Sequence, residues 1–396
     1  MSAARTGLRE RWQTQRDRLL TSPGFGDAAA RFVATRPFAR ARAHALFDLV
    51  AGFVYSQWLA ACVELRLFER LARGPLTAEQ IAMQDRLPLA SAERLLEAAA
   101  SLGLTERREP DSAGRVRHGL GPLGAAMVAN PAVAAMVEHH KALYAELADP
   151  LALLRRGEGG LARYWAYASS EAPAGLQDGT TAPYSALMSV TQPLVAAQVL
   201  DAVPLGRHKL LMDVGGGEGA FASAALERHP NLRAMVYDLP AVAAAANVRF
   251  GRLGLSHRAH ALGGDFHRDA LPRGADVISL VRVAYDHPDE RVLALLRAAR
   301  RALPPGGTLV LAEPMAATAG AEAMGAAYFG MYLLAMGSGR PRSAAELTAL
   351  LHRAGFNKVR RRRTALPLLA GVLVARAEGD MPDDGPGSEP RNVNPA

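Results

Sequence analysis

The chain has 396 residues and a hydrophobic content of 49%, which suggests two domains with buried cores and excludes a disordered or fibrous protein. The net charge is +8, and Cys62, the one cysteine, excludes an internal disulfide and a multi-cysteine metal site. Two uncharged stretches, residues 119–137 and 179–200, are interrupted by prolines and polar residues, and no signal-peptide pattern is present. We therefore expect a soluble, cytoplasmic protein.

Positive charge is concentrated in an N-terminal arm, residues 1–42. The arm contains nine arginines and three acidic residues, and Leu8, Trp12 and Leu19 would share one helical face. A basic amphipathic segment can lie on an anionic membrane surface. Packing of the arm against a partner subunit is an equally good interpretation.

Residues 43–183 are predicted to form a helical domain. Ala43–Leu59 carries a broad apolar stripe, which is typical of a helix buried at an interface. A helix that begins with a capping box of Thr77 and Gln80, a second helix over Ala90–Leu102 and two short strands then predict a winged helix.

The second helix of a winged helix reads DNA in regulatory proteins. Here Glu93 and Glu97 lie on that helix with Arg94 as its one basic residue, which makes a poor surface for phosphate groups. DNA binding is therefore the weaker interpretation, and we expect no nucleic-acid partner.

The next segment, residues 120–180, contains two groups of ring side chains. His139 and His140 are adjacent, so on a helix they point in different directions and do not predict a metal site. An aromatic cluster follows, which would line an apolar pocket or pack in the core, and it consists of Tyr164, Trp165 and Tyr167.

The most informative stretch is Asp213-Val-Gly-Gly-Gly-Glu-Gly-Ala220. An apolar strand over Lys209–Val214 leads into it, and a helix over Phe221–Arg228 follows. This arrangement places backbone N–H groups and a positive helix end at the carboxyl edge of a parallel sheet, where α/β sheets bind ligands. The glycine spacing is not G-x-G-x-x-G, which counts against a dinucleotide.

Two further segments complete the predicted site. The strand Arg233–Tyr237 ends in Asp238, and an acid at the end of the second strand is suited to hold two ribose hydroxyls. Asp265 and Phe266 follow Gly263-Gly264 and would supply an acid and an aromatic ring for an adenine. The three segments together predict a nucleoside pocket.

The rest of the chain alternates between strands and helices. We expect strands over Asp276–Leu280 and Thr308–Ala312, the latter ending in Glu313, and an apolar, methionine-rich helix over Ala321–Met336. A helix over Ala344–Ala354 and a terminal pair of strands follow. Residues 378–396, rich in Gly, Pro and Asp, are predicted to be a disordered tail.

The motifs DVGGGEGA, YDLP and GGDF, in this order after a helical domain, resemble those of the class I methyltransferases, and more narrowly the caffeic-acid-type O-methyltransferases. The segments RERWQTQRDRLL, LFDLVAGFVYSQ and SLVRVAYDHPDE are similar to bacterial carotenoid O-methyltransferases. The resemblance implies an α/β fold with a Rossmann-like seven-stranded sheet over residues 184–377. It also implies S-adenosylmethionine as cofactor and a homodimer formed by the winged-helix domain.

For the cofactor, the resemblance assigns Asp238 to the ribose, and Asp265 with Phe266 to the adenine. It places Gly215 beside the methionine part of the cofactor. The other predicted cofactor contacts are Asp213, Gly217 and, from the preceding helix, Met188.

For catalysis, the family uses a histidine in a segment of the form H-D-x-x-D-E, and Tyr285 occupies that position here. We expect Tyr285 to position the acceptor hydroxyl, with His287 as a second candidate for the base and Glu313 as a matching acid. Val281 replaces a family lysine, and a second family acid aligns loosely with Pro341.

The implied acceptor is a hydroxylated acyclic carotenoid of the demethylspheroidene or hydroxyneurosporene type, in the spheroidene branch of carotenoid synthesis in photosynthetic bacteria. A long apolar acceptor needs an apolar tunnel, and four residues of the late helix would line it: Met324, Tyr328, Met331 and Leu334. Such an acceptor resides in the membrane, which suggests peripheral contact of the basic arm with the inner, photosynthetic membrane.

Two alternatives remain open from sequence. One is an O-methyltransferase of an aromatic polyketide or phenol, against which the missing histidine argues. The other is a winged-helix regulator that uses the nucleoside pocket as a sensor.

Overall fold

The computed structural model describes residues 2–161, 182–367 and 369–379, without the side chains of residues 2–6, 23 and 182–190. It divides into two compact units, residues 1–130 and 131–396. The domain limits predicted at residues 42, 183 and 377 remain predictions. The aromatic cluster of Tyr164, Trp165 and Tyr167 and the tail beyond residue 379 lie outside the described residues.

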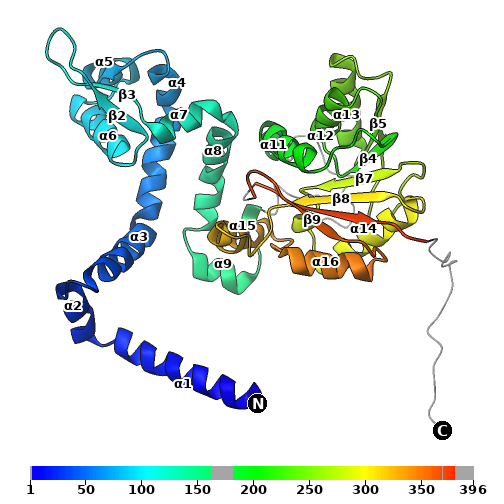
Figure 1. Cartoon of the computed structure of the whole chain (residues 1–396). Coiled ribbons are helices and arrows are strands. Elements are labelled where there is room, and N and C mark those ends of the chain that lie inside the picture. The colour runs from blue at the N-terminus through cyan, green and yellow to red at the C-terminus, as the bar shows by residue number, and fades with distance from the viewer. Residues whose placement is uncertain (1, 162–181, 368, 380–396) are drawn as a thin grey trace. The chain divides into compact units, whose positions relative to one another are not determined.

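The first unit is largely helical, with a small sheet near its end (Figure 1). Its helices are α1 (Ser2–Leu20), α2 (Pro23–Arg31), α3 (Arg36–Glu64), α4 (Leu67–Leu71), α5 (Ala78–Asp85), α6 (Leu89–Ser101) and α7 (Pro122–Ala129). Its strands, in the antiparallel order β1-β3-β2, are β1 (Leu76–Thr77), β2 (Thr105–Arg108) and β3 (Arg117–Leu120).

The helix pair α5–α6 and the three strands form the predicted winged helix. The backbone N–H of Gln80 donates to the Thr77 hydroxyl at 3.3 Å, and the Thr77 N–H donates to the Gln80 side chain at 2.8 Å. This reciprocal capping box fixes the start of α5, as its sequence predicts.

The long helix α3 is apolar on several faces and exposed within a single chain. Its exposed side chains include Leu46, Phe47, Leu49, Val50 and Phe53. Of the helices in the described part of the chain, α3 alone is long and apolar enough to cross a membrane. Exposed apolar surface of this extent marks an interaction site.

The second unit is a sheet with helices on both faces. Its strands are β4 (Leu210–Val214), β5 (Arg233–Asp238), β6 (Ala259–Gly263), β7 (Val277–Val281), β8 (Thr308–Glu313), β9 (Arg360–Arg362) and β10 (Gly371–Arg376). Its helices are α8 (Pro131–Glu146), α9 (Pro150–Arg156), α11 (Ala182–Ala202), α12 (Ala220–Arg228), α13 (Pro240–Arg252), α14 (Asp289–Ala302), α15 (Phe329–Met336) and α16 (Ala344–Arg353), with a short turn η3 (Ala284–Asp286) and a π-helix η4 (Met324–Tyr328).

Among the described residues, seven strands form this sheet in the order β6-β5-β4-β7-β8-β10-β9. The strands from β6 to β8 are parallel, and β10 is antiparallel to β8 and β9. Because parallel strands end at the same edge, the residues that follow β4, β5, β6, β7 and β8 gather there. The sheet confirms the predicted fold class.

The two faces of the sheet pack against different helices, α11, α12 and α13 on one face and α14 and α16 on the other (Figure 1). Side chains alternate along each strand, so Leu211 and Val236 face the first group while Met212 and Met235 face the second. The core is therefore nearly continuous on both faces, which holds the strand ends rigidly.

The late apolar helix differs from the prediction. The helix expected over 321–336 includes a π-helix, η4, before α15. Gly325 in this π-helix lies against the main chain of Met315, where an added Cβ would be 2.8 Å from the carbonyl oxygen. The close approach leaves no room for a larger residue at this turn.

Candidate active site

The glycine-rich turn after β4 exposes its main chain at Gly217. Gly215 and Gly217 have φ of +67° and +58°, a conformation that favours glycine. An added Cβ at Gly215 would lie 2.8 Å from Val283, whereas nothing lies within 4 Å of one at Gly217. A ligand can therefore approach the main chain at Gly217, as predicted for a cofactor turn.

Asp238, at the end of β5, is linked directly to this turn. Its carboxylate accepts the N–H of Gly217 at 2.8 Å and the N–H of Leu239 at 2.7 Å. Burial raises the pKa of Asp238, and the two backbone hydrogen bonds oppose the rise. The Asp238 carboxylate thus joins the end of β5 to the glycine-rich turn after β4. Its oxygens keep lone pairs that can accept hydrogen bonds from hydroxyl groups.

Asp213 lies beneath the same turn and is 1% exposed. Its Oδ1 accepts a hydrogen bond from the Ser279 hydroxyl at 2.6 Å, while its Oδ2 has no partner among the described residues. Burial raises the pKa of Asp213 to about 7. A buried carboxylate oxygen without a donor, beside exposed main chain, fits the polar methionine part of S-adenosylmethionine.

Asp265 and Phe266 lie at the same sheet edge, in the loop after β6. The Asp265 carboxylate accepts the N–H of His267 at 2.9 Å, and the N–H of Asp265 donates to Asp269 at 2.8 Å. These bonds fix the loop that carries the Phe266 ring. The loop begins beside Asp238, whose carbonyl accepts the N–H of Gly264 at 2.9 Å, so the Asp265 carboxylate, the Phe266 ring and Asp238 lie at one edge of the sheet, which fits an adenosine.

The turn η3 follows β7 and carries Tyr285. Glu313, at the end of β8, accepts the N–H of Val283 at 3.1 Å and the N–H of Ala284 at 2.7 Å, and burial raises the pKa of Glu313 to about 8. Glu313 therefore supports the main chain that carries Tyr285, and its predicted place among the catalytic residues stays a prediction.

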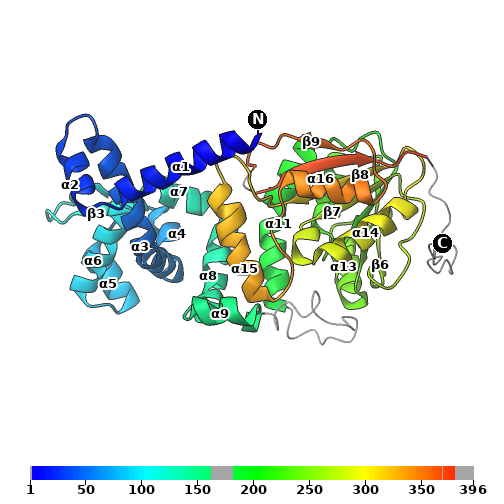
Figure 2. The ribbon, with the colours of Figure 1, turned by 90° about the horizontal axis from the view of Figure 1, so that it is seen from below.

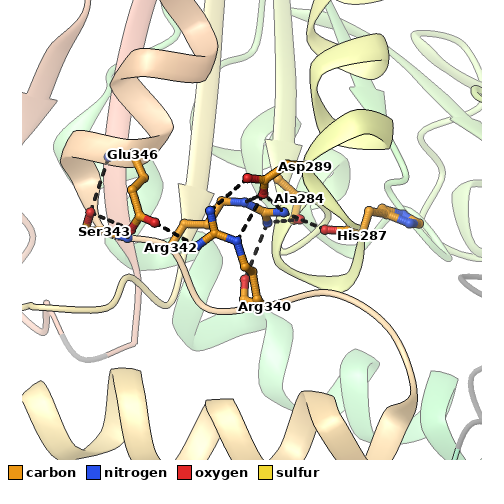
Figure 3. A network of polar contacts seen from close by, with 7 residues as sticks. All are labelled: Ala284, His287, Asp289, Arg340, Arg342, Ser343 and Glu346. Atoms are coloured by element: carbon orange, nitrogen blue, oxygen red, sulfur yellow. Dashed lines mark hydrogen bonds and ion pairs between the residues drawn. The ribbon is translucent and has the colours of Figure 1, made fainter. Parts of the chain in front are cut away.

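Arg342 also holds this turn, through the contacts drawn in Figure 3. Its guanidinium donates to the carbonyls of Ala284 and His287 at 2.8 and 2.7 Å and to the Asp289 carboxylate at 2.7 Å. Arg342 is 2% exposed, so these bonds lie away from water. Sequence reasoning missed Arg342, although it is next to Pro341, the position aligned loosely with a family acid.

Tyr285 is buried, with its ring edge-on to Phe329 at 6.1 Å between centroids. Its side chain makes a hydrogen bond to Asp286, a residue that sequence reasoning also missed. Burial and the neighbouring Glu313 charge raise the pKa of Asp286 well above its ordinary value. The structure thus brings Tyr285, Asp286 and Glu313 together.

His287 faces a different group of rings. It meets Phe266 and His267 edge-on, at 5.7 and 4.7 Å between centroids. Burial lowers the pKa of His287 to about 3, so the neutral ring is a weak base. Its predicted role as a base stays a prediction.

The remaining predicted residues are placed only in part. Met188 lies on α11, and its side chain is outside the described side chains. Met331 and Leu334 pack against the cluster that contains Tyr285, while Met324 and Tyr328 belong to the π-helix. Within the described residues, no group of three or more His, Cys, Asp or Glu could hold a metal ion.

Family comparisons agree with this geometry. Residues 144–357 match the O-methyltransferase domain, and residues 47–130 match the O-methyltransferase dimerisation domain. Demethylspheroidene O-methyltransferase of Cereibacter sphaeroides is 42% identical over 92% of this chain and 95% of the relative. The enzyme of the same name from Rhodobacter capsulatus is 41% identical over 85% of this chain and 82% of the relative.

Among solved structures, human N-acetylserotonin methyltransferase in complex with S-adenosylmethionine has the same fold, with a TM-score of 0.71 at 23% identity over 85% of this chain and 98% of that one. Both the family matches and the residues at the sheet edge fit the same cofactor. The chain belongs to the family of O-methyltransferases with an N-terminal dimerisation domain, and it is an enzyme that uses S-adenosylmethionine as its methyl donor.

Proposed function

We propose that the enzyme methylates the hydroxyl group of an acyclic hydroxycarotenoid of the demethylspheroidene or hydroxyneurosporene type. The observation that carries the proposal is the identity of 42% and 41%, over most of the chain, with two enzymes named for demethylspheroidene. The apolar surroundings of Tyr285 support it, because a long hydrocarbon acceptor needs apolar neighbours.

The residues at the sheet edge have separate roles in this proposal. Asp238 holds the ribose hydroxyls, Asp265 and Phe266 hold the adenine, and Asp213 with the turn at Gly215 and Gly217 holds the methionine part. When bound, S-adenosylmethionine supplies a methyl group already activated by a sulfonium. The protein therefore contributes mainly alignment and exclusion of water.

The acceptor sets the requirement for proton removal. A phenol has a pKa of about 10, but an aliphatic alcohol is far less acidic, so its proton leaves only as the methyl group transfers. Tyr285 orients the acceptor oxygen through its hydroxyl. Glu313 and Arg342 fix the turn that carries Tyr285.

The test is methyl transfer from labelled S-adenosylmethionine to hydroxycarotenoid and, separately, to a panel of phenols and aromatic polyketides. We expect label in a carotenoid methyl ether. Transfer to phenols with none to the carotenoid would replace this proposal with the phenolic alternative.

The proposed enzyme is a homodimer, for which the match to the dimerisation domain is the support. A second copy would cover the exposed apolar side chains of α3, including Phe47 and Phe53. Light scattering of Phe53→Glu should detect monomer, whereas Leu8→Glu, on the exposed arm, should leave the dimer intact. A Phe53→Glu variant that remained dimeric, like Leu8→Glu, would contradict this interface.

Contact with the cytoplasmic face of an anionic membrane is a further part of the proposal. Its support is the basic arm, in which Leu8, Trp12 and Leu19 are exposed on α1. Liposome flotation should recover the full-length protein and lose the protein that lacks residues 1–42. Equal recovery of the two would remove the membrane role.

We propose no nucleic-acid partner. Glu93 and Glu97 lie on α6, the helix that would enter a DNA groove, and Glu97 is near Arg107 at 3.8 Å. Retention on DNA that weakens with salt would contradict this.

A further inference from the structure

Two adjacent histidines of α8 each meet a tyrosine of the late helical segment. Nε2 of His139 lies 3.0 Å from the Tyr332 hydroxyl, and Nε2 of His140 lies 2.7 Å from the Tyr328 hydroxyl. The Tyr328 and Tyr332 rings are stacked, with centroids 6.0 Å apart. Helices α8 and α15 pack together (Figure 2), so these pairs join residues 193 and 188 positions apart.

The pairs lie where the helix is irregular. The π-helix η4 ends at Tyr328, and α15, which carries Tyr332, begins with the next residue. π-Helical turns are rare and occur frequently at functional sites. The irregular turn therefore gives an independent reason to look for function at the two pairs.

The His139–Tyr332 pair is the one beside Tyr285, the residue that we propose orients the acceptor hydroxyl. Tyr332 and Tyr285 belong to the same buried cluster, and the charges of Tyr285 and Asp286 act on Tyr332. His139 thus faces Tyr332, and Tyr328 and His140 lie next to this pair. The other titratable groups that act on Tyr332 are Tyr285, Asp286 and Arg282.

The protonation states set the direction of the hydrogen bond between His139 and Tyr332. Burial lowers the pKa of His139 and raises the pKa of Tyr332. At neutral pH the imidazole is then neutral and the phenol is protonated, so the Tyr332 hydroxyl donates to Nε2 of His139. His287 is also neutral, with a pKa lowered to about 3, but it meets the rings of Phe266 and His267, whereas His139 meets a tyrosine hydroxyl.

We propose that Tyr332 and His139 together remove the acceptor proton, in place of the histidine whose position Tyr285 occupies. This rests on the O-methyltransferase activity and not on which alcohol is the acceptor. The acceptor O–H bond breaks and its proton passes to the Tyr332 oxygen, while the Tyr332 proton passes to Nε2 of His139. The acceptor oxygen uses the electron pair of its broken O–H bond to form the bond to the methyl group. The electron pair of the methyl–sulfur bond stays on the donor sulfur. The imidazolium of His139 later loses its proton to water.

The test compares His139→Gln and Tyr332→Phe with His140→Gln in the full-length enzyme, using an acceptor that the wild type methylates. We expect His139→Gln to lower kcat about 100-fold without a change in the KM for the donor. Activity of the wild type should fall as the pH drops through the lowered pKa of His139, and His139→Gln should lack this fall. His140→Gln should retain most of the activity, and equal losses in both histidine variants would overturn the proposal.

A second measurement does not depend on activity. In the free enzyme labelled with ¹⁵N-histidine, the spectra of the two histidine variants assign the His139 resonances. We expect the neutral His139 to carry its proton on Nδ1, and Tyr332→Phe to shift its Nε2 signal. A proton on Nε2 would overturn the proposal. If the wild type methylated a phenol but no carotenoid, only the proposed acceptor would be wrong. The histidine and tyrosine variants would then be compared with the wild type on that phenol.

Discussion

The proposed donor side and the proposed acceptor side of this enzyme are built in different ways. On the donor side, the turn after β4, Asp238 and the loop after β6 lie within residues 213–269. Hydrogen bonds to Asp238 join them, one from the N–H of Gly217 to its carboxylate and one from the N–H of Gly264 to its carbonyl. On the acceptor side, His139, Tyr285 and Tyr332 come from α8, η3 and α15, far apart in the sequence. Local motifs thus specify the donor site, whereas packing between distant segments specifies the surroundings of the acceptor.

If this division is correct, the largest loss should come from Asp238. We expect Asp238→Ala to weaken binding of S-adenosylhomocysteine about 10²- to 10³-fold, because it removes charge-assisted hydrogen bonds to two hydroxyls. It also leaves the N–H of Gly217 without its acceptor. Calorimetric titration measures the loss, and unchanged affinity would contradict the assigned ribose role.

Tyr285→Phe tests the acceptor side. We expect kcat to fall about 10- to 100-fold, since orientation of the acceptor oxygen is lost, while donor affinity stays the same. Steady-state kinetics with the hydroxycarotenoid measure this. Full turnover by Tyr285→Phe would refute the positioning role.

Arg342→Met should affect the acceptor turn without disturbing the donor site. We expect a loss of about 2–3 kcal/mol in the free energy of unfolding, because two buried carbonyls lose their donor. Arg340→Met is the matched control, since Arg340 is more exposed and its bonds to Asp289 and Glu346 lie near the surface. Denaturant unfolding of the two variants measures the difference, and equal losses would contradict the support assigned to Arg342.

The last prediction concerns pH and Glu313. Burial raises the pKa of Glu313 from 4.5 to about 8, so the folded state binds this proton more tightly than the unfolded state. The resulting stabilisation is present below pH 4.5 and is lost as the pH rises through about 8. We expect the Tm of Glu313→Gln to fall less than that of the wild type over this range, and parallel pH curves would contradict it.

The same division explains what could be predicted from sequence. The capping box at Thr77, the strand before the glycine turn and the acid at Asp238 depend on neighbours in the chain, and the structure places them as predicted. The π-helix η4 depends on the close packing of Gly325 against Met315, which no local pattern indicates.

The candidate site follows the same rule. Arg342 and the partners of His139 and His140 could not be predicted, because their significance arises only when distant segments meet. Adjacent histidines do point in different directions on a helix, but Tyr328 and Tyr332 lie four positions apart and meet both of them.

The central claim is tested most directly by competition in one reaction. Labelled S-adenosylmethionine, a hydroxycarotenoid in vesicles and a phenol at equal concentration are incubated with the wild-type enzyme, and the labelled products are separated. We expect most of the label in the carotenoid methyl ether. Label confined to the phenol ether, or absent from both products, would contradict the proposed function.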